Sequence, residues 1–72
     1  MIDITLEGGY VTFYSSAIGL ISSNVESCEV VDDNSLHLGT IVGVLLINIA
    51  EFTINGITFS TSAEALTYIL NN

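Results

Sequence analysis

The chain has 72 residues, with eight Asp or Glu, one His and no Lys or Arg, which gives a formal net charge of −8. At this length folding buries only about 60% of the unfolded surface, so we expect a single small domain over residues 1–72. Nucleic-acid binding requires cations that neutralise phosphates, and the composition therefore excludes direct DNA or RNA binding. The missing guanidinium groups also argue against nucleotide-phosphate chemistry.

The negative charge has its own consequences. Eight carboxylates scattered along the chain are too few to imitate duplex DNA, which carries about one charge per 1.7 Å of its axis. Without Lys or Arg, each ionised carboxylate must be solvated, hydrogen-bonded or paired with another chain. A basic protein partner is one interpretation of this pattern.

Disulfide, export and membrane signals are missing from the sequence. Cys28 is the only cysteine, so an internal disulfide is impossible. The residues Met1–Thr5 lack the positively charged start of a signal peptide, and we expect no export signal. The most apolar segment, Leu36–Ala50, contains polar residues and is shorter than the roughly 20 residues of a membrane-spanning helix, so we expect no membrane span.

The first half of the chain predicts two hairpins. Ile2–Leu6 alternates apolar and polar residues, and a turn at Glu7-Gly8-Gly9 leads into the second strand, Tyr10–Tyr14. The segment Ser15–Ser27 leaves two alternatives open, a short helical turn capped by its first serines or a loop and strand. The second hairpin has strands at Cys28–Val31 and Leu36–Leu38, joined by the turn Asp32–Ser35.

Thr40–Ile49 is rich in Val and Ile, which predicts a core strand buried on both faces. It carries no charge and no proline, and such strands aggregate when their edges are left open. Soluble monomers guard edges with Lys or other charges, and Lys is unavailable here. Two explanations follow: the strand is central in its own sheet, or a neighbouring subunit covers it. The second gains weight because so small a domain has little volume with which to cover the strand.

The last third predicts a hairpin followed by a helix. Phe52–Ile54 and Ile57–Phe59 flank Asn55-Gly56, a dipeptide that favours a type I′ turn. Thr61 and Glu64 have the spacing of a capping box, so a helix should begin there and end at Asn71-Asn72. Four residues at helical spacing form its apolar side, and we expect Leu66 and Ile69 to dock on the sheet. These four residues are Ala65, Leu66, Ile69 and Leu70.

Together these elements predict an α+β fold. We expect a small β-rich sheet, or a partly open barrel, of about five strands with one C-terminal helix.

No pattern for catalysis or metal binding emerges. Cys28, His37 and a nearby carboxylate could in principle form a nucleophile system, but the predicted hairpin puts Cys28 at its far end and His37 near the turn. We therefore interpret Cys28 as a small core residue and His37 as a hydrogen-bonded sheet residue. Asp32–Ser35 lacks the ligand pattern of a calcium loop, and one Cys with one His makes only half a zinc site. We expect no catalytic residue, cofactor or metal.

The segment Phe52–Ile69, FTINGITFSTSAEALTYI, resembles the hairpin-plus-helix ending of several small bacteriophage proteins. Together with the small size and nearly cation-free composition, it makes the chain similar to short virion proteins from phage structural gene clusters. The resemblance covers the last third of the chain and contains no diagnostic motif. It implies a structural or decoration component, made in the host cytoplasm and present in many copies in the virion.

Our first hypothesis is therefore a non-enzymatic virion component that contacts copies of itself or a larger virion protein, as an oligomer or within a larger assembly. Tyrosine combines apolar area with a polar tip and is enriched at interfaces. The candidate contact residues are these tyrosines and the apolar residues of the uncharged strand: Tyr10, Tyr14, Ile41, Val42, Val44, Leu46 and Tyr68. The alternative hypothesis is a small acidic soluble protein that binds and regulates a basic protein partner.

Overall fold

The computed structural model describes residues 1–72 and contains seven strands, one 3₁₀ turn and one helix. The elements are β1 (Ile2–Glu7), β2 (Tyr10–Ser15), β3 (Gly19–Asn24), β4 (Ser27–Asp32), β5 (Ser35–Thr40), β6 (Gly43–Asn48), η1 (Ile49–Glu51), β7 (Phe52–Ile54) and α1 (Ser62–Leu70). The predicted class, a β-rich α+β domain with a C-terminal helix, is confirmed. The strands form two open sheets, ordered β3-β2-β1-β7 and β4-β5-β6.

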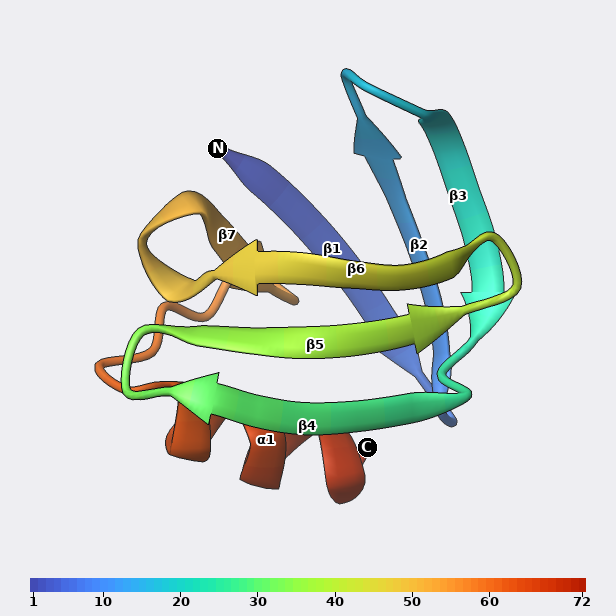
Figure 1. The fold of residues 1–72 in the computed structure, drawn as a ribbon. Helices are drawn as coiled ribbons and strands as arrows, with labels where there is room; N and C mark the ends of the chain where they lie inside the picture. Colours follow the sequence, from blue (N-terminus) through green and yellow to red (C-terminus); the bar gives the residue numbers. More distant parts are fainter.

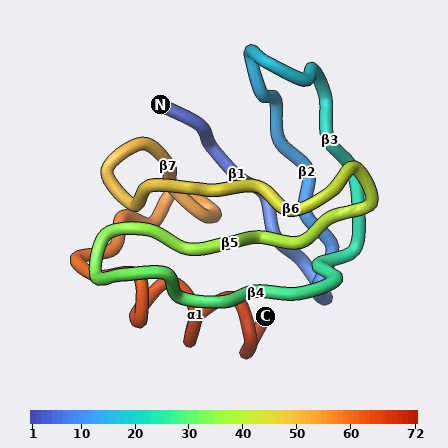
Figure 2. Tube along the Cα trace, in the orientation of Figure 1, coloured from blue at the N-terminus to red at the C-terminus, as the bar shows by residue number.

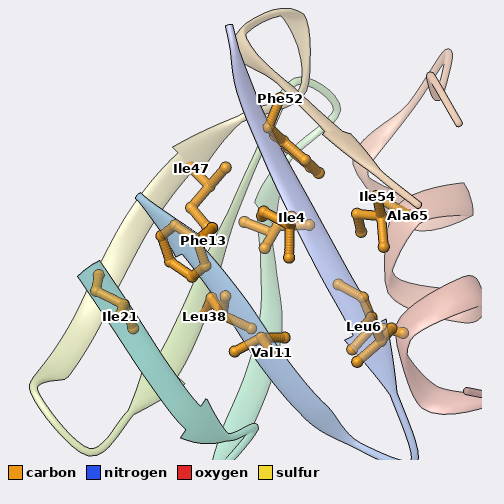
Figure 3. Close-up of a cluster of buried hydrophobic side chains, with 12 residues drawn as sticks. Ile4, Leu6, Val11, Phe13, Ile21, Leu38, Ile47, Phe52, Ile54 and Ala65 are labelled. Atoms are coloured by element: carbon orange, nitrogen blue, oxygen red, sulfur yellow. The ribbon is translucent and has the colours of Figure 1, made fainter. Parts of the chain in front are cut away.

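The two sheets lie in separate layers, and their strands cross at a large angle (Figure 1). The trace in Figure 2 shows the chain passing from the first layer to the second between β3 and β4. The core lies between the layers and contains 12 buried apolar residues, most of which are labelled in Figure 3. Such burial contributes about 25 cal/mol per Å² of apolar surface removed from water. In a chain with one cysteine, this core is the main source of stability.

The first hairpin is confirmed, and its turn depends on glycine. Gly8 and Gly9 have φ angles of +59° and +75°, the left-handed conformation that a type I′ turn requires at both positions. Of the two alternatives for the segment Ser15–Ser27, the strand is correct. β3 pairs antiparallel with β2 along its whole length and buries Ile21 in the core.

The second hairpin is also confirmed, with β4 and β5 extending beyond the predicted strands. The turn is held by the Asp32 carboxylate, whose Oδ1 accepts hydrogen bonds from the Asn34 N–H and the Ser35 hydroxyl, both at 2.8 Å. Asp and Ser therefore act here through side-chain hydrogen bonds, as the turn composition indicates.

The prediction that Thr40–Ile49 is a strand buried on both faces is wrong. The segment turns back at Ile41 and Val42 and only then forms β6, which lies at the edge of its sheet. Ile47 is buried, whereas Val44 and Leu46 point to the outer face and are exposed. Apolar residues on both faces of β6 hide the period-two alternation from which a half-exposed strand is normally recognised.

The predicted Asn55-Gly56 hairpin forms only in part. Asn55 and Gly56 have φ angles of +52° and +80°, as a type I′ turn requires, but pairing beyond the turn is limited to Ile54 with Ile57. β7 instead pairs in parallel with β1. This arrangement buries Phe52 and Ile54 beside Ile4, a gain that an isolated hairpin cannot provide.

The terminal helix is confirmed together with its N-cap. The Thr61 Oγ1 accepts a hydrogen bond from the Glu64 N–H at 3.3 Å, and the helix ends at Asn71. Its buried face is formed by Ser62, Ala65 and Ile69, while the predicted Leu66 is only half-buried. The helix lies along β4, at the side of the second sheet opposite β6 (Figure 1). It is too short to span a membrane.

Candidate interaction surface

An exposed apolar surface, which we call the β6 patch, is formed by Ile41, Val42, Val44 and Leu46. The first two residues form the tip of the β5–β6 hairpin and are 73% and 52% exposed. Val44 and Leu46 lie on the outer face of β6 and are 63% and 67% exposed. These four residues are predicted contact residues, and the fold brings them together on one hairpin at the edge of one sheet.

The backbone of β6 is open on the side away from β5. The Ile49 N–H donates to the Asn34 carbonyl at 2.8 Å, so the odd-numbered residues of this segment direct their backbone groups toward β5. Val44, Leu46 and Asn48 consequently direct theirs outward. No hydrogen bond outside the strand ladders involves the backbone of Val44 or Leu46. The same two residues thus expose both an apolar side chain and unpaired backbone groups.

Along Val44 and Leu46 this edge has none of the usual features that keep another strand away. Natural sheets guard their edges with charged side chains, proline, bulges or a covering element. β6 has no charged residue and no proline, and its pairing with β5 is regular from Thr40–Gly43 to Ser35–Asn48. The other edge of the same sheet is different, because α1 packs against β4 and β4 contains two charged residues, Glu29 and Asp32.

The predicted tyrosines are not part of the β6 patch. Tyr10 and Tyr14 lie on the outer face of the other sheet, on β2, where both are exposed. Tyr68 makes contacts within the chain: its ring centroid lies 5.5 Å from that of Phe59, and its hydroxyl accepts a hydrogen bond from Asn55 Nδ2 at 2.9 Å.

Sequence reasoning missed a second exposed apolar position on this outer face. Leu20 lies opposite Tyr14 in the β2–β3 pairing and is 71% exposed. The sequence Gly19–Asn24 gave little warning, because exposed and buried residues alternate in the structure while the adjacent Leu20 and Ile21 are both apolar.

Cys28 and His37 are not arranged as a nucleophile and base. In the β4–β5 register Cys28 lies opposite Leu38, and His37 lies in mid-strand opposite Glu29, so the prediction of His37 near the turn is wrong. The side chains of neighbouring residue pairs in a ladder point to opposite faces of the sheet, so Cys28 points toward the core and His37 points outward. Burial raises the pKa of the half-buried Cys28 thiol. No three His, Cys, Asp or Glu side chains gather as metal ligands, and the surface has no pocket.

The carboxylates are all exposed, and half of them lie along β4 and its two ends: Glu26, Glu29, Asp32 and Asp33. The two hydrogen bonds that the Asp32 carboxylate accepts at the turn, from the Asn34 N–H and the Ser35 hydroxyl, hold its pKa below the usual value. The second sheet therefore has an acidic edge at β4 and an uncharged apolar edge at β6.

The chain matches no protein-family profile, no curated protein and no solved structure.

Proposed function

We propose that the protein is a non-enzymatic structural component that makes protein–protein contacts through the β6 patch. The observation that carries this proposal is an edge strand on which exposed apolar side chains and unpaired backbone groups coincide. The sequence leaves two explanations for an uncharged strand, and the edge position removes the one in which β6 is central in its own sheet. This edge position supports the other explanation, coverage by another subunit.

The β6 patch is small for a stable interface. Burying an exposed Val, Leu or Ile side chain contributes up to about 1.5–3 kcal/mol, and the four patch residues are already partly buried. A stable interface buries about 800 Å² per partner, roughly a fifth of the 4195 Å² surface of this chain. The patch side chains alone are therefore a modest contact, to which the unpaired backbone groups of β6 would add hydrogen bonds.

We propose further that this assembly is a bacteriophage capsid or a related part of a virion, with the protein made in the host cytoplasm. The support is the resemblance of Phe52–Ile69 to small phage proteins and the nearly cation-free composition. The partner is a second copy of the chain or a larger virion protein.

A second candidate function is supported by the acidic edge. Four exposed carboxylates along β4, in a chain with no Lys or Arg, would attract a basic protein surface. A small acidic regulator bound in this way would associate by charge, and its binding would weaken steeply with added salt.

Sedimentation velocity at low and high ionic strength tests the proposed function. We expect the wild-type protein to form an oligomer that persists in high salt, and Leu46→Lys to shift it to the monomer. Leu20→Lys is the matched control, because it places the same charge at an equally exposed leucine on the other sheet, and it should leave the oligomer intact. Circular dichroism checks that both variants fold. A wild-type monomer at both salt concentrations would contradict the proposal.

A further inference from the structure

We propose that two copies of the chain join by pairing β6 with β6 in antiparallel orientation, main chain to main chain. The two three-stranded sheets would then become one continuous six-stranded sheet. This inference rests on the proposed function and adds to it the identity of the partner and the geometry of the contact.

The outward backbone groups limit the register, and the apolar side chains on the same residues select one. Val44 and Leu46 each direct an N–H and a carbonyl to the open side. In antiparallel pairing about a two-fold axis at Leu45, Val44 lies opposite Leu46 of the second copy, and the two such pairs exchange four hydrogen bonds. Asn48, whose backbone groups also point outward, would lie opposite Val42 at the hairpin tip of the second copy.

The side chains suit the same register. Val44 and Leu46 are both on the outer face, so each apolar side chain would lie directly across from an apolar side chain of the other copy. In Figure 1 the ends of β1, β2 and β3 extend beyond β6. A strand added to β6 would therefore continue the second layer across the first sheet.

Charge argues for a second copy as the occupant. Two chains of net charge −8 repel each other, and they can approach only where carboxylates are distant. No carboxylate occurs between Asp33 and Glu51, and the nearest one within the sheet is Glu29 on β4. In the paired sheet the two β4 strands would be five strand spacings apart, about 24 Å, which exceeds the screening length of about 8 Å at physiological salt. A basic partner, by contrast, would bind at β4, where the carboxylates of this chain lie.

The remaining edges fit strand addition less well. The Val25 N–H donates to the Gly9 carbonyl, so the outward positions of β3 are Leu20, Ser22 and Asn24, and two of these three are polar. The tip of the β5–β6 hairpin also lies at β3, where the Ile41 N–H donates to Ser23 Oγ at 2.9 Å. β7 has only three residues, and β4 is packed against α1.

Chemical synthesis of this short chain allows a direct test. A variant with N-methylleucine at Leu46 replaces the outward N–H by a methyl group and keeps the side chain and the bonds to β5. We expect its association constant, measured by sedimentation equilibrium, to fall at least ten-fold. The matched control carries N-methylleucine at Leu20, whose N–H is also directed outward, and should associate as the wild type does.

The outcomes separate the two proposals. Loss of association on methylation at Leu46 alone supports the paired strands. If the chain methylated at Leu46 associates as strongly as the wild type while Leu46→Lys is monomeric, strand pairing is overturned and the proposed function stays in place. Loss on methylation at Leu20 alone would move the contact to β3 and overturn this inference. A wild-type monomer would overturn both proposals.

A second measurement does not depend on the methylated chain folding. With the axis at Leu45, this residue would lie opposite its own copy in a non-hydrogen-bonded pair, with about 4.5 Å between Cα atoms, a separation that a disulfide can bridge. In a Cys28→Ser background, Leu45→Cys should form a covalent dimer on mild oxidation, whereas Leu20→Cys should not. An associated protein that remains uncrosslinked at position 45 would contradict the register.

Discussion

The Asn55 side chain takes the place of a strand residue beside β1. Its Oδ1 accepts the Leu6 N–H and its Nδ2 donates to the Leu6 carbonyl, both at 2.9 Å. The pairing of β1 with β7 is thereby prolonged by an amide side chain where the backbone turns away. The Asn-Gly signal predicts the turn, but this second role depends on a contact 49 residues distant along the chain, which no local pattern records.

Substitutions at Asn55 should separate its two roles. Asn55→Gly keeps the positive φ and removes the side-chain hydrogen bonds, and we expect it to lower the free energy of unfolding by about 1–3 kcal/mol. Asn55→Ala should cost about 1–2 kcal/mol more, because alanine is strained at φ +52°. Tyr68→Phe, which removes only the bond to Asn55 Nδ2, is the control and should cost less than either. Urea unfolding measures all three, and an Asn55→Gly variant as stable as the wild type would refute this role.

Asp32 gives the turn between β4 and β5 a defined pH dependence. Its pKa is lowered from the ordinary 3.8 by the hydrogen bonds from the Asn34 N–H and the Ser35 hydroxyl. A carboxylate with a lowered pKa in the folded state stabilises it fully above the unfolded pKa, and this contribution is lost as the pH falls through the folded pKa.

We therefore expect Asp32→Asn to have a lower thermal midpoint than the wild type at neutral pH. The difference should close as the pH falls below 3.8 and Asp32 is protonated. Asp33→Asn removes the same charge from the adjacent position without those two hydrogen bonds and serves as the control. Thermal unfolding followed by circular dichroism across the acid range provides the comparison. A difference that persists unchanged below the folded pKa would show that the carboxylate charge is not its source.

At the scale of elements, the contact between α1 and the β4–β5 turn holds the helix in place. The buried Ser62 donates its hydroxyl hydrogen to the Asp32 carbonyl, and its N–H donates to the Asp33 carbonyl at 2.9 Å. A helix of nine residues is unstable in isolation, so this contact and the burial of Ala65 and Ile69 are what make it form.

Ser62→Ala should consequently destabilise the whole domain by about 1–2 kcal/mol. For a chain of this size that corresponds to a fall in the thermal midpoint of roughly 4–15 °C. Thr67→Ala is the control, because its hydroxyl donates to the Ala63 carbonyl on the exposed side of the helix, and its effect should be smaller. Equal midpoints for the two variants in differential scanning calorimetry would refute a docking role for Ser62.

Elements whose signals are local were predictable from the sequence. The turns at Gly8-Gly9 and Asp32–Ser35 and the cap at Thr61 depend on residues close in the chain, and all three are found where expected. The parallel pairing of β1 with β7 is a long-range choice that no spacing reveals. The error at Thr40–Ile49 arose because an apolar outer face looks the same in sequence as a buried one.

The candidate surface was predictable for a related reason. A segment that lacks charge and is rich in Val, Leu and Ile needs cover whether or not the strand boundaries are right, so Ile41, Val42, Val44 and Leu46 were predicted as contact residues from composition. Tyr68 lies outside this surface, half-buried against the core and packed on Phe59, because an aromatic residue in a helix is equally suited to internal packing; its role as a contact residue stays a prediction.

At the scale of the whole molecule, charge and apolar surface are separated across one sheet. Carboxylates follow β4 and exposed apolar residues follow β6, with β5 between them. With the proposed pairing, the apolar edges would meet at the centre of a six-stranded sheet and the acidic edges would lie at its two ends. Repulsion between copies would then limit further growth of the sheet, since α1 and four carboxylates occupy each end.

Amide hydrogen exchange of β6 at low and high protein concentration tests this account most directly. The N–H groups of Leu45 and Ile47 bond to β5 and should be protected at both concentrations. Those of Val44 and Leu46 should exchange rapidly in the dilute protein and become protected as it associates. Unchanged exchange of Val44 and Leu46 in an associated protein, or new protection at Leu20 and Ser22 instead, would contradict the account.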